Sequence, residues 1–304
     1  MKLESLRYFH VARQCGSIRK AAERLHVAAS AVSRQIAILE REVGLPLFER
    51  TATGVATTAA GEVLARHTRS MFREIDRARS AIEDLKGLRA GEVVIYAIEG
   101  MVSEVLPRLL SSFHARFPGI SFKLVFAPTD RIVEAVLSDE ADIGITFNAR
   151  PRPELAIVAR YAEPLSCLVS PSHPLACSES VSLQHLKSYP VALPTNAFGL
   201  RQLIDLAAKR RGISLQPMLT TDSLELTKQL AAAGVAVAFM PAFTVAREIR
   251  AGSLRCLPLD EKAFRSVGTE VCVHRNRTIS TAAQEFLKAL VPVVKALGQA
   301  RQAF

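Results

Sequence analysis

Two short helical patterns stand back to back between Ser17 and Gly44, and they restrict the possible fold more than any other feature of the chain. The stretch reads SIRKAAERLHVAASAVSRQIAILEREVG. Its first pattern begins at Ser17, a favourable N-cap residue. Its second pattern has apolar residues at the spacing of a helical stripe, namely Val32, Ile36, Leu39 and Val43. Because only a few small residues separate the patterns, the segment predicts two helices joined by a tight turn, as in a helix-turn-helix.

The face of the second helix opposite this stripe has short polar side chains and one long cation. It includes Ser30, Ala31, Ser33 and Arg34. A major groove admits one α-helix and offers hydrogen-bond acceptors to Arg and Ser, so this face is suited to contact DNA. Consecutive amphipathic helices also occur in domains that never contact DNA, because hydrophobic periodicity reports burial. The helix pair alone leaves both interpretations open.

The composition narrows the class of protein. A length of 304 residues, 49% of them hydrophobic, is enough for roughly two domains with a sizeable core. The sequence has no run of about 18 uncharged apolar residues and no signal-peptide core, so we expect a cytoplasmic protein with no membrane partner. The net charge of +10 suits a polyanionic partner. Between Lys2 and Ala59, nine Lys and Arg residues stand against five Glu residues.

The five cysteines are scattered and include no CxxC pair. A disulfide framework or a zinc site is therefore not expected, and neither a metal nor a cofactor is predicted. Cys167 and Cys177 are the alternative, as a redox pair, but isolated buried thiols are favoured.

A hairpin and a long helix are expected after the helix pair. The stretch TATGVATT has β-branched residues around a glycine and predicts a small wing, and Thr58 can cap the next helix. That helix is expected over residues 58–86, before a linker marked by Gly87 and Gly91. Its apolar residues form a heptad seam that favours pairing with a second copy, although the helix can instead lie on its own domain. The seam consists of Leu64, Met71, Ile75, Ala78, Ile82 and Leu85.

From Glu92 onward, strand and helix patterns alternate. Strands are expected at residues 93–98, 122–126 and 143–146, with helices between them, which predicts a parallel sheet with right-handed crossovers. A second series begins near Leu165. It predicts strands around 167–170, 190–194, 215–221 and 235–241, helices over 200–211 and 224–233, then a strand at 270–275 and a helix over 281–297. The two series indicate two α/β lobes with a ligand cleft between them.

The sequence also resembles a known family. AAERLHVAASAVSRQIAILEREVGLPLFERTATGVATTAAGEVL closely resembles the N-terminal signature of LysR-type transcriptional regulators, and LPRLLSSFHARFPGISFKL and EADIGI continue the resemblance. It implies a multidomain α and α/β protein: a winged helix-turn-helix over residues 1–58, a dimerising linker helix over 59–89, and a two-lobed, periplasmic-binding-protein-like effector domain over 90–304. Lobe I is expected at about 90–162 and 266–304, and lobe II at about 163–265. The implied partners are promoter double-stranded DNA, a small-molecule effector and further copies of the chain, as a dimer of dimers.

The resemblance implies site residues by position. The DNA contacts fall on Ser30, Ala31, Ser33, Arg34, Gln35 and Arg50. Ala37, Ile38 and the wing lack the basic residues frequent in the family, so fewer phosphate contacts are expected. The effector-binding positions are Glu99, Gly100, Met101, Ser103, Thr129, Phe147, Asn148, Asn196, Phe198, Gly199, Arg201, Thr221 and Ser223.

Two of these positions have competing roles. Arg201 can grip a ligand carboxylate, or it can pair with Glu99 or Asp222 and serve the structure. Thr129 is expected to cap the helix that follows, and its hydroxyl can also face a ligand.

The sequence argues against three other functions. An enzyme is disfavoured because the sequence has no GxSxG, HExxH, P-loop or clean GxGxxG, and no catalytic residue is predicted. A solute-binding protein of a transporter needs an export signal and no basic helix pair. A sequence-independent nucleoid protein has no need of a lobed ligand domain.

Overall fold

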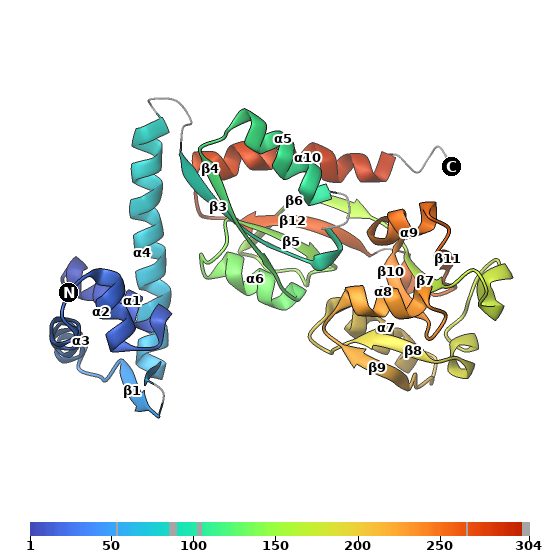
Figure 1. Ribbon diagram of the computed structural model, residues 1–304, viewed down its shortest axis with the longest axis horizontal. Coiled ribbons are helices and arrows are strands. Elements are labelled where there is room, and N and C mark those ends of the chain that lie inside the picture. Colours follow the sequence, from blue (N-terminus) through green and yellow to red (C-terminus); the bar gives the residue numbers. More distant parts are fainter. Residues whose placement is uncertain (53, 85–89, 102–104, 266, 300–304) are drawn as a thin grey trace. The chain divides into compact units, whose positions relative to one another are not determined.

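The computed structural model describes residues 1–52, 54–84, 90–101, 105–265 and 267–299. The chain divides into two compact units, Met1–Arg79 and Ser80–Phe304, each of which is described by itself (Figure 1).

Three helices pack around a small core in the first unit. They are α1 (Leu3–Cys15), α2 (Ile18–Leu25) and α3 (Ala29–Val43). Ser17 accepts a hydrogen bond from the Lys20 N–H and caps α2, as predicted. His26 ends α2 with a φ of 56°, in the left-handed region, which gives the sharp turn into α3. The predicted stripe on α3 is buried at Val32, Ile36 and Leu39 and packs against α1 and α2.

The wing is the hairpin of β1 (Phe48–Thr51) and β2 (Gly54–Thr57), which pair antiparallel. Thr58 then caps α4 (Ala59–Asp84), because its Oγ1 accepts from the Gly61 N–H at 3.0 Å. A Cβ on Gly61 would lie 2.2 Å from the carbonyl oxygen of Leu47. The first turn of α4 therefore packs against the backbone at Leu47 at a distance that only a glycine at position 61 allows.

The N-terminal end of the predicted seam on α4 packs within the first unit. Leu64 and Met71 contact a buried cluster that includes Phe9 and Leu39. Ile82 is 64% exposed, and Leu85 and Gly87 lie outside the described residues. The seam therefore has a part that packs within the first unit, at Leu64 and Met71, and an exposed part at Ile82. At Leu64 and Met71 the helix lies on its own domain, which was the alternative to pairing with a second copy.

Lobe I of the second unit is built on a five-stranded sheet of order β4-β3-β5-β12-β6. Its strands are β3 (Gly91–Ala97), β4 (Ile120–Phe126), β5 (Ile143–Phe147), β6 (Leu155–Ala162) and β12 (Gly268–His274). Only the pairs of β3 with β4 and β5 are parallel, whereas β12 runs antiparallel to both β5 and β6. The three strands predicted to form a parallel sheet, β3, β4 and β5, are parallel as expected, and β12 adds an antiparallel part that was not predicted. Gly91, expected in a linker, begins β3.

Helices cover both faces of this sheet (Figure 1). On one face, α5 (Val105–Arg116) and α10 (Thr281–Gln299) pack together, with the rings of Phe113 and Phe286 in edge contact at 5.3 Å. On the other face lies α6 (Thr129–Leu137), whose Ile132 and Val136 contact Gly144 of β5 closely enough that a Cβ on that glycine would clash with both. A short helical turn, η1 (Glu99–Met101), follows β3.

Lobe II has two small sheets. One has the order β10-β7-β11 and the other pairs β8 with β9 in parallel. The strands are β7 (Leu165–Val169), β8 (Val191–Pro194), β9 (Pro217–Thr221), β10 (Ala238–Pro241) and β11 (Arg255–Pro258). The helices are α7 (Gly199–Arg210), α8 (Leu224–Ala232) and α9 (Ala246–Arg250), with the shorter turns η2 (Pro174–Cys177), η3 (His185–Ser188), η4 (Ala242–Val245) and η5 (Lys262–Phe264).

The chain passes between the lobes twice. It leaves β6 at Ala162 and enters β7 at Leu165, and it returns from η5 to β12 between Phe264 and Gly268. The two crossings lie side by side, because the Glu163 N–H donates to the Val267 carbonyl at 3.1 Å. Two adjacent crossings are the simplest connection about which two lobes can close on a ligand.

Candidate functional site

The first candidate surface is the exposed face of α3. Ser30, Ser33 and Arg34 are exposed, and Ala31 is half-buried beside them. The same helix buries its apolar stripe on the opposite side, so packing alone fixes which residues face outward. Arg50 is exposed on β1 of the wing.

Gln35 differs from its predicted neighbours. It is half-buried, and its Oε1 accepts a hydrogen bond from the Oγ of Ser5 at 2.7 Å. Ser5 is only 1% exposed, so this bond joins α1 to α3. Gln35 therefore helps to hold the helix whose exposed face carries Ser33 and Arg34.

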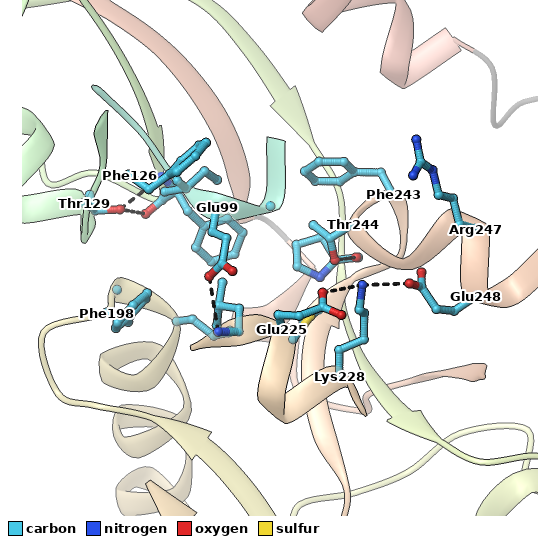
Figure 2. Close-up of a pocket in the computed structure, with 18 residues that line it drawn as sticks. Glu99, Phe126, Thr129, Phe198, Glu225, Lys228, Phe243, Thr244, Arg247 and Glu248 are labelled. Carbon is cyan, nitrogen blue, oxygen red and sulfur yellow. Dashed lines mark hydrogen bonds and ion pairs between the residues drawn. The ribbon is translucent and has the colours of Figure 1, made fainter. Parts of the chain in front are cut away.

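The second candidate site is a cavity of about 540 Å³ in the second unit (Figure 2). Both lobes line it: β3–η1, β4, α6 and β5 from lobe I, and α7, α8, β10, η4 and α9 from lobe II. Six residues predicted at the effector site line this cavity: Glu99, Gly100, Thr129, Phe147, Phe198 and Gly199.

Other predicted positions lie elsewhere. Met101 is fully buried in the core of lobe I. Ser103 lies outside the described residues. Five more do not line the cavity: Asn148, Asn196, Arg201, Thr221 and Ser223. Ser223 is instead the N-cap of α8, where its Oγ accepts from the Leu226 N–H at 3.1 Å.

Arg201 has a structural partner that the sequence did not indicate. Its Nε donates to Asp205, one helical turn away, at 2.8 Å, and its Nη1 donates to the Pro194 carbonyl at 3.2 Å. Of the two roles considered for Arg201, the structure shows the structural one, with Asp205 as the partner in place of Glu99 or Asp222.

Thr129 does not cap α6, contrary to prediction. Pro128 is the N-cap residue, and Thr129 is already inside the helix. The buried Thr129 Oγ1 donates to the Phe147 carbonyl and accepts from the Phe147 N–H, both at 3.1 Å. The hydroxyl thus joins α6 to the end of β5 at the wall of the cavity.

Glu99 reaches across the cavity from lobe I (Figure 2). Its Oε2 accepts a hydrogen bond from the Leu224 N–H at the start of α8, at 3.3 Å. The positive end of the α8 dipole therefore faces a carboxylate that belongs to the protein itself.

A charged group in lobe II was missed by sequence reasoning. Lys228 Nζ lies 2.6 Å from Glu225 Oε2 and 2.7 Å from Glu248 Oε1, and all three residues line the cavity. Burial lowers the pKa of the Lys228 ammonium, but its bonds to the two glutamates outweigh burial and raise that pKa overall. Glu225 and Lys228 share one helical face, which is a detectable signal, whereas Glu248 joins them only through the fold.

The remaining lining residues were also not predicted. Most are apolar, and Arg247, a further cation, is exposed. They are Ile98, Phe126, Leu200, Leu224, Met240, Pro241, Phe243, Thr244 and Arg247.

Comparison with known proteins places both units in one family. The profile of the LysR substrate binding domain matches residues 86–295, and that of the bacterial regulatory helix-turn-helix protein of the lysR family matches residues 3–62. The chain belongs to the LysR family. It is a transcriptional regulator with a helix-turn-helix DNA-binding domain and an effector-binding domain, and the enzyme interpretation is excluded because this family consists of regulators.

Relatives match over almost the whole chain. The RuBisCO operon transcriptional regulator of Allochromatium vinosum is 28% identical over 288 residues, covering 94% of each chain. A probable RuBisCO transcriptional regulator of Cyanophora paradoxa is 28% identical, covering 95% of this chain and 91% of the relative.

Solved structures show the same fold. CbnR in complex with its target DNA superimposes with a TM-score of 0.67 at 23% identity, covering 96% of this chain and all of CbnR. A full-length OxyR variant from Pseudomonas aeruginosa has a TM-score of 0.73 at 20% identity, covering 97% and 95% of the two chains. Within the residues described here, no helix is both long and apolar enough to span a bilayer.

Proposed function

We propose that this LysR-type regulator recognises promoter DNA through the exposed face of α3. Ser30, Ala31, Ser33 and Arg34 contact the major groove, and Arg50 on the wing contacts phosphate. The observation that carries this proposal is the division of α3 into a buried stripe and an exposed polar face that includes Ser30, Ser33 and Arg34. Gln35 acts differently, since its bond to Ser5 positions the helix.

The second part of the proposal concerns control by a small molecule. The effector binds in the cavity between the lobes, where Glu99, Gly100, Thr129, Phe147, Phe198 and Gly199 contact it. A ligand regulates only if it prefers one lobe arrangement, and the cavity has walls from both lobes. The 3.3 Å bond between Glu99 and Leu224 crosses it, so the cavity contents act directly on the lobe-to-lobe contact.

The third part concerns assembly and location. Ile75 and the exposed Ile82 on α4 pair with the same residues of a second copy, and two such dimers associate. The protein acts in the cytoplasm, where promoter DNA is accessible.

Selection of bound fragments from genomic DNA, followed by footprinting, tests the proposed function. We expect a small number of discrete sites, each with two half-sites related by two-fold symmetry, since a symmetric protein presents two reading helices. Uniform protection of unrelated sequences would contradict the proposal and favour a nucleoid protein.

A further inference from the structure

The position of Glu99 determines which ligand charge the cavity accepts. A helix N-terminus attracts anions, because its first N–H groups have no partner within the helix. At α8 this position is already taken, since Glu99 Oε2 accepts from the Leu224 N–H at 3.3 Å and Ser223 accepts from the Leu226 N–H. A ligand carboxylate would therefore compete with a carboxylate of the protein at the N-terminus of α8.

The other ionisable groups of the cavity do not reverse this preference. Among the described residues, the lining has three carboxylates, Glu99, Glu225 and Glu248, and two cations, Lys228 and Arg247. Lys228 is 12% exposed and lies within 2.7 Å of two carboxylates, so it has little capacity left for an anion. Arg247 is exposed to water, which weakens any ion pair that it forms.

Aromatic rings supply the second half of the site. Phe126, Phe147, Phe198 and Phe243 line the same cavity, from both lobes. Figure 2 labels three of them, Phe126, Phe198 and Phe243. The faces of aromatic rings attract cations, and rings together with a carboxylate form a favourable environment for an organic ammonium or amidinium group. Glu99 is half-buried, and among the described residues its Oε1 accepts no hydrogen bond, so this oxygen is available to a ligand donor.

We propose, on the basis of the effector site above, that the cavity binds an organic cation. The ligand has a protonated amine or amidine that donates to Glu99 and an apolar body that packs against the phenylalanines. Glu99 is thus the residue that determines specificity, and it selects against carboxylate ligands.

Three small probes with one ring and different charges test this inference. Benzamidine is a cation, benzamide is neutral and benzoate is an anion. Their affinities for the full-length protein are measured by titration calorimetry at one salt concentration. We expect benzamidine to bind at least about tenfold more tightly than benzoate. Its amidinium can donate a charge-assisted hydrogen bond to the Glu99 carboxylate, whereas the benzoate carboxylate is repelled by it.

Variants then localise the effect. Glu99→Gln keeps an oxygen for the Leu224 N–H but removes the charge, and it should abolish the preference for benzamidine. Glu179→Gln removes one charge at an exposed position that does not line the cavity, and it should keep the preference. Thermal melts establish that both variants are folded.

Three results would overturn the inference: no binding of benzamidine, an equal or greater affinity for benzoate, or an unchanged preference in Glu99→Gln. The same preparations are tested on selected promoter DNA. If the protein prefers the selected promoter DNA but the probes do not behave as expected, only the proposed ligand class is rejected. If the protein shows no DNA sequence preference, the proposed function is rejected.

Discussion

The hydroxyl of Thr129 makes two hydrogen bonds to one residue, because it donates to the carbonyl of Phe147 and accepts from its N–H, each at 3.1 Å. Both partners are buried, so removing the hydroxyl leaves two backbone groups of Phe147 without this partner. Thr129→Val keeps the shape and should lower the free energy of unfolding by about 1–3 kcal/mol. Thr129→Ser keeps the hydroxyl and should lower the free energy of unfolding less than Thr129→Val does. Thermal melts compare them, and equal melting temperatures for the Val and Ser variants would contradict this role.

Gly100 and Thr244 set how closely the lobes approach at the rim of the cavity. A Cβ on Gly100 would lie 2.8 Å from Thr244 Cγ2, so Gly100→Ala should force the two lobes apart locally and cost about 1–3 kcal/mol. Thr244→Ser removes that methyl group but keeps the hydroxyl that donates to the Pro241 carbonyl at 2.7 Å. The double variant should regain most of the lost melting temperature. No recovery would show that the contact is not the cause.

His10 gives the first unit a pH-dependent stability. Burial lowers the pKa of its imidazole, and the nearby cations Arg69, Arg13 and Arg24 lower it further. As pH falls, the imidazole therefore takes up a proton in the unfolded chain before it does so in the folded protein. The contribution of His10 to the free energy of unfolding is present above about pH 6.5 and is lost as pH falls from there toward the lower folded-state pKa.

His10→Gln should therefore flatten the dependence of melting temperature on pH below about 6.5. His114→Gln, which removes an exposed imidazole from α5, is the matched control and should leave the dependence unchanged. A His10→Gln variant with the wild-type pH profile would rule out this assignment.

Local patterns predicted the helices well, while pairings distant in sequence were missed. The apolar stripe on α3 consists of residues three or four positions apart in the sequence, so the local pattern is enough to predict it. It is buried at Val32, Ile36 and Leu39, as predicted. The sheet of lobe I depends on β12, which arrives more than 100 residues after β5 and inserts antiparallel between β5 and β6. No local pattern specifies that partner.

The residues of the cavity were likewise predicted only in part. The resemblance to the LysR family implied Glu99, Thr129 and Phe198 as effector-binding positions, and these residues line the cavity. Glu248 reaches Lys228 only because α9 packs beside α8, which the sequence does not indicate. Thr129 was expected to be a cap because Thr at a helix start commonly is one, yet Pro128 takes that position.

Assembly through α4 depends on the exposed part of the seam. Ile82→Lys should shift the protein toward smaller species in light scattering, because a buried charge in a helix pair is costly. Val63→Lys makes the same change at an exposed position of α4 outside the seam and should keep the wild-type mass. Unchanged mass in Ile82→Lys would exclude the seam.

The ratio of affinities for a selected promoter site and a scrambled duplex, at one salt concentration, tests directly whether α3 reads the DNA sequence. We expect a ratio of about 10³ or more for the wild-type protein. Arg34→Ala should reduce it by at least about tenfold, since one good bidentate contact contributes roughly 1–3 kcal/mol of discrimination. Arg152→Ala removes the same charge from an exposed position in the effector domain and should leave the ratio unchanged. A ratio near one for the wild type, or an unchanged ratio in Arg34→Ala, would contradict the assignment of α3 as the reading helix.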